Sequence, residues 1–486
     1  MSRIVLKRIV MMALLVASIA TLSVVKWIQT DGSSDTILRL VNNRKQKNDF
    51  DQLFDNTVFK SFTISFDETV FQSLLDDMQS YFDLYGTYQD NTMHPVTMTY
   101  NDSDGTSFTL EEVGFRTKSN TSRNLPLTYD WMNRATYHQT SFQLQFDETF
   151  DYAKNSNEYA VLKGREAFNL EQLNFEFCKS FDGEYDAAMI SEAYAYELYR
   201  NAGVDVSHAS YGIVYLQVGD VLINYGFFTF IEPIDKVFLA DNYKSDVIGD
   251  YGDLYKATDV AGIADLSVDS ISLAGINDNP LNLRYSYALQ NNTLGDTRTS
   301  HDTLLHFMQN IADSAHFSEM AEDILDVDQF LRALAMGFLI GNTDDYRYNF
   351  NNYYLYFKVY TSKAVFIPFD LDNALGFGKH QDLTYRYGVD YPIFSDQDDL
   401  AVLVGAVFSI ESYRNLYVDY LESFANELFS YDDFYAEYTT AKALYETVLV
   451  SENHLGNQAF GLRNIAWYMV TKKTNVLSQV EEYRGN

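Results

Sequence analysis

GNTDDYRYNFNNYYLYFKVYTSKAVFIPFDLDNALG, residues 341–376, is a polar loop followed by two short apolar runs and a second polar loop. The runs, Tyr353 to Phe357 and Ala364 to Phe369, are bounded by turn residues, which predicts two buried strands. The Asp and Asn side chains therefore stand at strand ends, where a rigid scaffold presents polar groups to a cleft. Oxygen ligands from two adjacent loops are what Mg²⁺ bound to phosphates requires.

The spacing within the first loop narrows this prediction. Asp344 and Asn349 stand five positions apart, as do the Asp and Asn of the catalytic loop of protein kinases. In kinases this Asp accepts the proton of the substrate hydroxyl, the Asn holds a metal ion, and an Asp beyond the next hairpin holds Mg²⁺. Asp370 or Asp372 would take that last place. The His and Arg of the kinase loop are absent here, so a pair of Asx-rich turns in a β-hairpin is the alternative interpretation.

Length and composition set broad limits. The 486 residues suffice for two or three domains or for one large two-lobed unit, and 47% hydrophobic with 16% aromatic residues can bury a sizeable core. The formal net charge of -33, from 35 basic and 68 acidic residues, argues against nucleic acid as a partner. A basic partner fits this charge, but a solvated acidic surface alone is the simpler explanation. The single cysteine, Cys178, excludes an intramolecular disulfide and a cysteine-based zinc site.

The N-terminus predicts a targeting segment. Arg3, Lys7 and Arg8 precede a mostly apolar run from Ile9 to Val25. Basic residues before such a run predict a cytoplasmic N-terminus, and we favour an uncleaved signal anchor within residues 1–30 because Trp27 stands at the membrane interface of such a segment. A cleaved signal peptide is the alternative. Both place the remainder outside the cytoplasm, with residues 31–58 as a polar stalk.

The remainder divides into a β-rich part, residues 59–235, and a mainly helical part, residues 236–486. Alternation of apolar and polar residues predicts the strands Ser61–Phe66, Val96–Tyr100, Phe108–Phe115, Thr140–Phe146, Phe168–Phe175, Ile213–Val218 and Leu222–Ile231. Helical spacing predicts the helices Glu68–Tyr81, Ala187–Ala202, His301–Ala315, Ala321–Ile340, Asp399–Phe429, Phe434–Val450 and Gly461–Tyr483. Lys244 to Asn292 is polar and turn-rich, which predicts loops. The fold class is therefore α+β. Its order of parts is that of a two-lobed, kinase-like fold, with the hinge at Glu232 to Lys236.

Several blocks of the sequence resemble the CotH-type (spore coat protein H) kinases, a family of atypical, secreted or surface-linked protein kinases. The blocks, in the family's order, are VGFRTKSNTSRN (113–124), TSFQLQF (140–146), FNLEQLNFEF (168–177), MISEAYAYELYRNAGVDVSHAS (189–210), YGFFTFIEPIDKVFL (225–239), LYKA (254–257), GNTDDYRYNFNNYYLYF and FIPFDLDNALGFG. They cover roughly residues 62–378. The resemblance implies ATP and Mg²⁺ or Mn²⁺ as cofactors. It also implies transfer of phosphate to Ser, Thr or also Tyr of a surface or secreted protein, such as a basic, Ser-rich one.

The resemblance also implies a role for individual residues. Asp344 would be the catalytic Asp, although the adjacent Asp345 could take this role instead. The metal ligands would be Asn349, Asp370 and Asp372. On the nucleotide side, Arg116 and Lys118 would face the phosphates, and Lys256 would be another cationic contact. Glu192 would be the acidic partner of a phosphate-binding lysine, and Glu232 would lie in the hinge.

The sequence also departs from the family pattern. Ser119 stands where the family usually has Gly, and Gln139, Thr140, Gln143 and Ile190 stand at positions that are often basic in the family. Fewer cations around the nucleotide mean weaker neutralisation of the phosphates. The alternative to an active kinase is therefore a surface structural or adhesion protein that keeps the fold but has lost catalysis.

Overall fold

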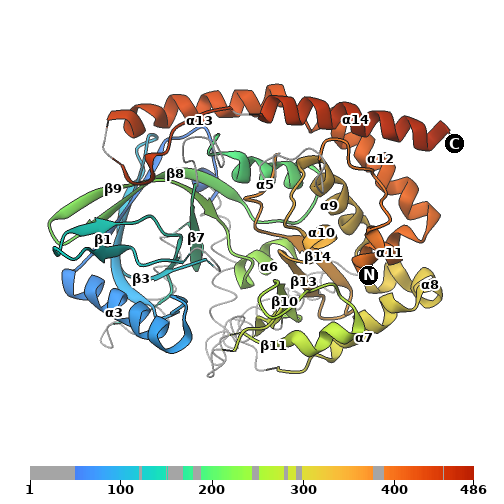
Figure 1. The fold of residues 1–486 in the computed structure, drawn as a ribbon, viewed down its shortest axis with the longest axis horizontal. Coiled ribbons are helices and arrows are strands. Elements are labelled where there is room, and N and C mark those ends of the chain that lie inside the picture. Colours follow the sequence, from blue (N-terminus) through green and yellow to red (C-terminus); the bar gives the residue numbers. More distant parts are fainter. Residues whose placement is uncertain are drawn as a thin grey trace, which may run out of the picture.

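The computed structural model describes residues 50–119, 123–148, 150, 168–178, 188–243, 251–277, 283–291, 298–375, 388–451, 454–462 and 464–485. The predicted anchor or signal peptide at residues 1–30 lies outside these ranges. Within them, no helix combines the length and the apolar character needed to cross a membrane. The fold is a mixed α+β fold, as the sequence predicts (Figure 1).

A closed β-barrel forms the N-terminal part. Its strands, in spatial order, are β1 (Lys60–Phe66), β2 (His94–Asp102), β3 (Ser107–Thr117), β6 (Phe142–Gln145), β7 (Gln172–Phe177), β9 (Val221–Ile231) and β8 (Ala209–Val218). β1 alternates strictly between buried and half-buried residues, so one face of the strand points into the barrel. Parallel pairing of β1 with β8 closes the barrel. Outside it lie helix α3 (Glu68–Tyr85) and the small hairpin β4 (Leu127–Tyr129) and β5 (Ala135–Tyr137).

Aromatic rings fill the barrel. Phe62 contacts the rings of Tyr100, Phe175 and Phe230 at centroid distances of 5.1, 5.1 and 4.9 Å, and all four side chains are buried. Such edge-to-face contacts add to the free energy gained by removing large apolar surfaces from water. The barrel is therefore a packed core and not a channel.

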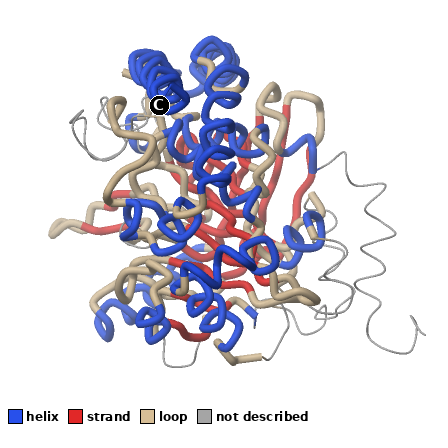
Figure 2. The backbone as a smooth tube through the Cα atoms, turned by 90° about the vertical axis from the view of Figure 1, so that its right-hand side faces the viewer, coloured by secondary structure: helices blue, strands red, loops and turns tan. Residues whose placement is uncertain are grey.

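The C-terminal part combines a sheet with helices. The sheet has the order β11 (Ala274–Ile276), β12 (Tyr287–Leu289), β10 (Leu254–Ala257), β13 (Tyr353–Phe357) and β14 (Ala364–Pro368). The helices are α5 (Ser191–Asn201), α6 (Lys236–Asn242), α7 (Asp302–Ala312), α8 (Ser314–Ile324), α9 (Val327–Ile340), α10 (Tyr346–Asn349), α11 (Val402–Phe408), α12 (Glu411–Glu427), α13 (Tyr431–Ser451) and α14 (Ile465–Gly485), and short 3-10 turns connect some of them. The view from this end shows helices across the face and strands behind them (Figure 2).

The structure corrects several sequence predictions. The region from Lys244 to Asn292 is not all loop, because its described residues include β10, β11 and β12. The helix predicted for Ala321–Ile340 is two helices, α8 and α9, because Leu325 adopts extended backbone and pairs with Ala364. The helix predicted for Asp399–Phe429 is divided into α11 and α12. The strand predicted from Phe168 begins at Gln172, because Phe168 and Asn169 both have φ of 61°.

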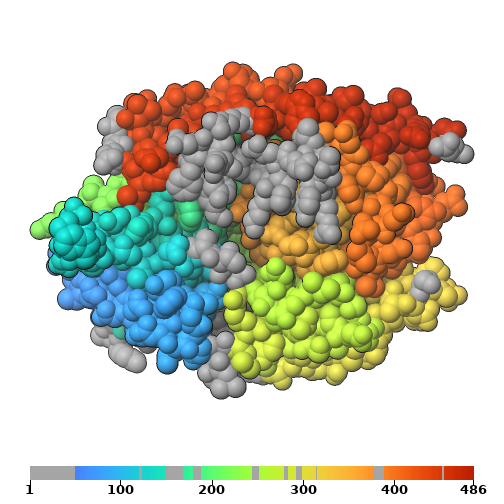
Figure 3. Space-filling model, viewed as in Figure 1, coloured from blue at the N-terminus to red at the C-terminus, as the bar shows by residue number. Residues whose placement is uncertain are grey.

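The predicted stalk also needs correction. The described residues of 31–58 are packed onto the barrel, with Leu53 and Val58 fully or almost fully buried. The two longest C-terminal helices, α13 and α14, extend over both parts of the molecule (Figures 1 and 3). Tyr445 of α13 receives a hydrogen bond from the backbone N–H of Lys60, and Gln458 donates to the carbonyl oxygens of Cys178 and Phe227. Tyr445 and Gln458 therefore connect the C-terminal segment of the chain to the barrel through hydrogen bonds.

Candidate functional site

The first polar loop begins where α9 ends, at Gly341, whose left-handed φ of 67° breaks the helix. Asp344 follows, and amide groups surround its carboxylate. Asn349 and Asn351 donate to Oδ1, and Asn352 donates to Oδ2 at 3.1 Å. Burial raises the pKa of Asp344, the hydrogen bonds from Asn349 and Asn351 lower it, and the nearby carboxylate of Asp372 raises it further. Asp344 and Asn349, which the spacing pairs, are thus in direct contact.

The structure distinguishes Asp344 from Asp345. The side chain of Asp345 is the N-cap of α10 and accepts a hydrogen bond from the backbone N–H of Tyr348 at 3.2 Å. Burial, followed by the charge of Asp345, raises the pKa of the buried Tyr199, so Asp345 lies close to the core residues of α5. Asp344 is the one close to Asp372. The two neighbours thus differ in surroundings: Asp345 caps α10, whereas amide side chains and the nearby carboxylate of Asp372 surround Asp344.

The second polar loop follows β14. Asp370 has a positive φ of 58°, a left-handed conformation that costs free energy for a residue other than glycine and occurs at functional sites. The hydroxyl of the buried Tyr196 accepts the backbone N–H of Asp370 at 3.0 Å and holds this turn. The side chain of Asp370 keeps access to solvent. Crowding by surrounding protein atoms and then the carboxylates of Asp372 and Glu176 raise the pKa of Asp370, and Lys118 and Lys256 oppose that shift.

Helix α5 brings a further carboxylate to this site. Glu192 is only 8% exposed. Burial, followed by the charges of Asp372 and Asp370, raises the pKa of Glu192 well above its usual value. A buried carboxylate among other carboxylates is unfavourable unless a cation or a proton compensates its charge.

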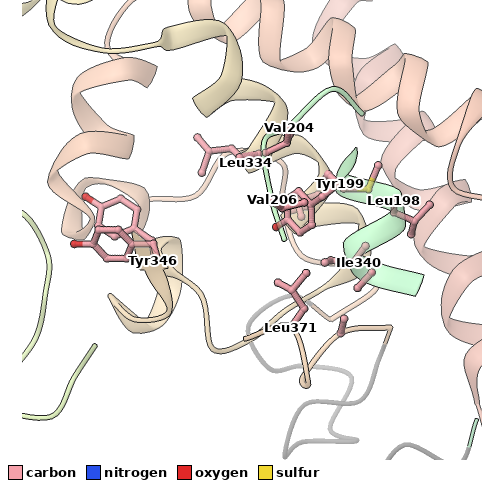
Figure 4. Close-up of a cluster of buried hydrophobic side chains, with 14 of the residues drawn as sticks. Leu198, Tyr199, Val204, Val206, Leu334, Ile340, Tyr346 and Leu371 are labelled. Atoms are coloured by element: carbon pink, nitrogen blue, oxygen red, sulfur yellow. The ribbon is translucent and has the colours of Figure 1, made fainter. Parts of the chain in front are cut away.

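One apolar core fixes the three segments relative to each other. Figure 4 shows Leu198 and Tyr199 of α5, Leu334 and Ile340 of α9, and Leu371 after Asp370 in one buried cluster. The helix that carries Glu192, the helix that leads to Asp344 and the turn at Asp370 thus share a core. Tight packing of this kind limits relative movement of the polar groups at its edge.

Two lysines face these carboxylates. Lys118, directly after β3, forms an ion pair with Glu176 of β7, with an Nζ–Oε1 distance of 3.1 Å. Lys256 of β10 lies over the ring of Phe369 at 4.7 Å. Burial, followed by the charge of Lys118, lowers the pKa of Lys256 to about 8. Both lysines are close enough to Asp370 to lower its pKa.

The ion pair corrects one expectation and adds a residue. Glu192 is near Lys118 and interacts with its charge, but the direct partner of Lys118 is Glu176. Sequence reasoning missed Glu176. The available signal was an acidic residue inside the otherwise apolar end of β7, within the block FNLEQLNFEF.

Arg116 and Glu232 have other partners. Arg116 donates from Nε to Oε1 of Gln143 at 2.8 Å and from Nη1 to Oδ1 of Asn91 at 2.7 Å, and its charge contributes to the lowered pKa of Lys256. Glu232, at the end of β9, accepts from the backbone N–H and the ring Nδ1 of His208 at 3.0 and 2.8 Å. Arg116 therefore lies near the two lysines. Glu232, which is 2% exposed, is instead hydrogen-bonded to His208.

Comparison with known proteins adds to this geometry. Comparison with curated proteins gives no match. One solved structure with some likeness is the HipA, HipB and operator DNA complex of a toxin–antitoxin system from Shewanella oneidensis MR-1, at 12% identity and a TM-score of 0.24. The match covers 77% of this chain and 64% of that one, and such a score supports no argument. The family model described as CotH kinase protein matches residues 131–482, a range that contains Glu176, Glu192, both polar loops and Lys256. The chain belongs to the CotH kinase protein family.

Proposed function

We propose that this protein is an extracytoplasmic protein kinase that transfers the γ-phosphate of ATP to Ser or Thr hydroxyls of a surface or secreted protein. The observation that carries the proposal is the meeting of charged groups from both parts of the chain. Lys118 and Glu176 come from the barrel, and Lys256 and Asp370 come from the C-terminal part. This placement supports a two-lobed, kinase-like arrangement with the site at the junction.

The residues present fit a divalent cation. Besides burial, the charges of Asp372 and Glu176 raise the pKa of both Asp370 and Glu192, and the charge of Asp370 also raises that of Glu192. Lys118 lowers the pKa of both groups, and Lys256 lowers that of Asp370. Four carboxylates and two ammonium groups leave an excess of negative charge, which one Mg²⁺ or Mn²⁺ ion would compensate. Carboxylate and amide oxygens are the ligands such ions prefer. We propose Asp370 and Asp372 as ligands, and Asn349 as a third.

In this proposal each group has one task. When bound, the metal ion supplies charge neutralisation at the phosphates. Lys118 and Lys256 bind phosphate oxygens, and Arg116 adds positive charge at the barrel side. Asp344 orients the acceptor hydroxyl and receives its proton. The amides of Asn349, Asn351 and Asn352 hold the carboxylate of Asp344 in one orientation. Catalysis of this kind is positioning and electrostatic stabilisation.

The location and partner belong to the same proposal. A signal anchor or signal peptide in residues 1–30 would place the rest outside the cytoplasm, with the membrane contacted through that segment alone. A chain with a net charge of -33 would attract a basic protein substrate by its long-range field. Nucleic acid would be repelled.

A second candidate is a surface structural or adhesion protein that has lost catalysis. The observation in its favour is that Gln143, at a position often basic in the family, takes the Nε hydrogen bond of Arg116. Less positive charge then faces the phosphates. Calorimetry with Mg²⁺ and ATP separates the two candidates, because micromolar binding contradicts the structural one.

The deciding experiment is phosphate transfer from γ-labelled ATP by the full chain, with Mg²⁺ or Mn²⁺ and a basic, Ser-rich protein. Asp344→Asn, Asp345→Asn and Asp370→Asn are compared with wild type, and Asp104→Asn in an exposed hairpin turn is the control. We expect transfer by wild type, Asp345→Asn and Asp104→Asn, and loss of transfer in Asp344→Asn and Asp370→Asn. Transfer that is unchanged in Asp370→Asn would refute the metal site. Absence of both transfer and ATP binding in wild type would refute the kinase.

A further inference from the structure

A second group of possible metal ligands lies on the barrel, apart from the polar loops. Asp77 is on α3, Asp90 is in the connection after α3, and His94 is the first residue of β2. One ligand atom from each of the three residues lies within 4.8 Å of the others. No role in the proposed kinase reaction uses any of them.

The histidine is the observation that points to a ligand. His94 is 5% exposed, and its Nε2 is buried without a hydrogen-bond partner among the described residues. A buried polar nitrogen that lacks a partner costs free energy. Burial lowers the pKa of His94, against the opposing charges of Asp77 and Asp90. The neutral imidazole is the form that binds metals.

The distance between the ligand atoms of His94 and Asp77 agrees with a shared ion. Nε2 of His94 and Oδ2 of Asp77 are 3.5 Å apart. Two ligand atoms at the usual bond lengths of a tetrahedral Zn²⁺ ion stand about 3.4 Å apart. The carboxylate of Asp90 is held in place by the backbone N–H and the hydroxyl of Thr92, at 3.2 and 3.1 Å. Each carboxylate oxygen can still offer a further lone pair.

We propose that Asp77, Asp90 and His94 bind one Zn²⁺ ion. An imidazole nitrogen with two carboxylate oxygens suits zinc better than magnesium, which prefers an octahedral set of oxygens. Three protein ligands leave the fourth position to water. The ion would tie the middle of α3, at Asp77, to the start of β2 and hold the connection between them.

That connection touches the candidate kinase site. Asn91 accepts hydrogen bonds from Arg116 at 2.7 Å and from Arg123 at 3.5 Å, and the backbone oxygen of Asp90 accepts from Arg123 at 2.8 Å. A bound ion would therefore fix the segment that positions these two arginines. This consequence for the arginines rests on the proposed function, whereas zinc binding itself does not.

The test is direct zinc binding by the full chain, after treatment with a chelator and in excess Mg²⁺ to occupy oxygen-rich sites. Asp77→Asn removes a ligand on the exposed side of a helix, so the variant keeps the fold. Asp76→Asn is the matched control, because Asp76 is its exposed neighbour and accepts a hydrogen bond from Gln72 instead. His94→Gln is a second ligand variant. Calorimetry and the zinc content after gel filtration give affinity and stoichiometry, and Co²⁺ in place of Zn²⁺ reports tetrahedral binding by its visible absorption.

We expect one Zn²⁺ per chain in wild type and in Asp76→Asn, with a raised melting temperature in both. Asp77→Asn and His94→Gln should bind at least tenfold more weakly and lose the cobalt absorption. Equal zinc binding by Asp77→Asn and Asp76→Asn, or no binding by wild type, would overturn the proposal. These readouts involve no ATP, so they are independent of whether the kinase proposal holds.

Discussion

Arg347 and Asp398 form a buried, two-pronged ion pair, with Nε–Oδ1 and Nη2–Oδ2 distances of 2.8 Å each. The side chains are 0% and 6% exposed. The guanidinium also donates to the hydroxyl of Tyr417 at 2.9 Å and to the carbonyl oxygen of Ile393 at 3.0 Å. Arg347 lies between Asp344 and Asn349 in the chain. The ion pair therefore anchors the first polar loop to the segment at Asp398 and, through Tyr417, to α12.

The first prediction concerns this anchor. Arg347→Ala leaves the carboxylate of Asp398 buried without its partner, so we expect a loss of about 3–5 kcal/mol in the free energy of unfolding. Lys442→Ala is the control, since Lys442 pairs with Glu446 at 3.3 Å on the surface of α13, where such pairs contribute about 1 kcal/mol or less. Urea titrations followed by circular dichroism measure both. Similar losses in the two variants would contradict the anchoring role.

The cap of α10 gives a second prediction. Asp345 accepts the backbone N–H of Tyr348, and Asn can replace this acceptor whereas Ala cannot. We expect Asp345→Ala to lower the free energy of unfolding by about 1 kcal/mol and Asp345→Asn to change it little. The same urea titrations measure the effect. Equal destabilisation by both would mean that the charge of Asp345, and not its cap, matters for folding.

The third prediction concerns pH in the absence of metal. The pKa of Glu192 is raised well above its usual value, mainly by burial, so folding favours its protonated form. That stabilisation is fully present below the unfolded pKa of 4.5 and is lost as pH rises through the folded pKa. Glu192→Gln, which stays neutral, should therefore gain stability relative to wild type as pH increases from 5 to 8.

Melting temperatures of wild type and Glu192→Gln at a series of pH values test this, with Glu319→Gln on the exposed face of α8 as control. The control should follow wild type at every pH. Mg²⁺ should raise the melting temperature of wild type at pH 8 more than that of Glu192→Gln, because the ion compensates the buried charge. A difference between wild type and Glu192→Gln that does not change with pH would refute the pKa argument.

A fourth prediction separates binding from stability at Lys118. The pairs Lys118–Glu176 and Lys358–Asp326 have similar exposure, at 27%/28% and 24%/30%. Replacement of either lysine by Met should lower the free energy of unfolding by about 1 kcal/mol or less, because such pairs are screened by solvent. Only Lys118→Met should weaken the binding of Mg²⁺ and ATP, by at least tenfold in calorimetry. Unchanged affinity would remove Lys118 from the site.

The sequence predicted the local elements that depend on periodicity and turn residues. The alternation in Ser61–Phe66, the two apolar runs after Asn352 and the helical spacing of α3, α13 and α14 all correspond to observed elements, because each pattern reflects a face that must be buried. The matched order of blocks also identified the family, which the family model confirms. The contact between Asp344 and Asn349 followed from local spacing.

Contacts between distant segments were decided only by the tertiary structure. The sequence could not pair Lys118 with Glu176, since 58 positions separate them. Nor could it show that His208 forms a hydrogen bond with the carboxylate of Glu232. It could not divide the helix predicted for Ala321–Ile340, because the break at Leu325 depends on pairing with Ala364. Local pattern records which side of an element is buried, but not which element covers it. That choice depends on packing of the whole chain, and here packing also decides which carboxylates face the two lysines.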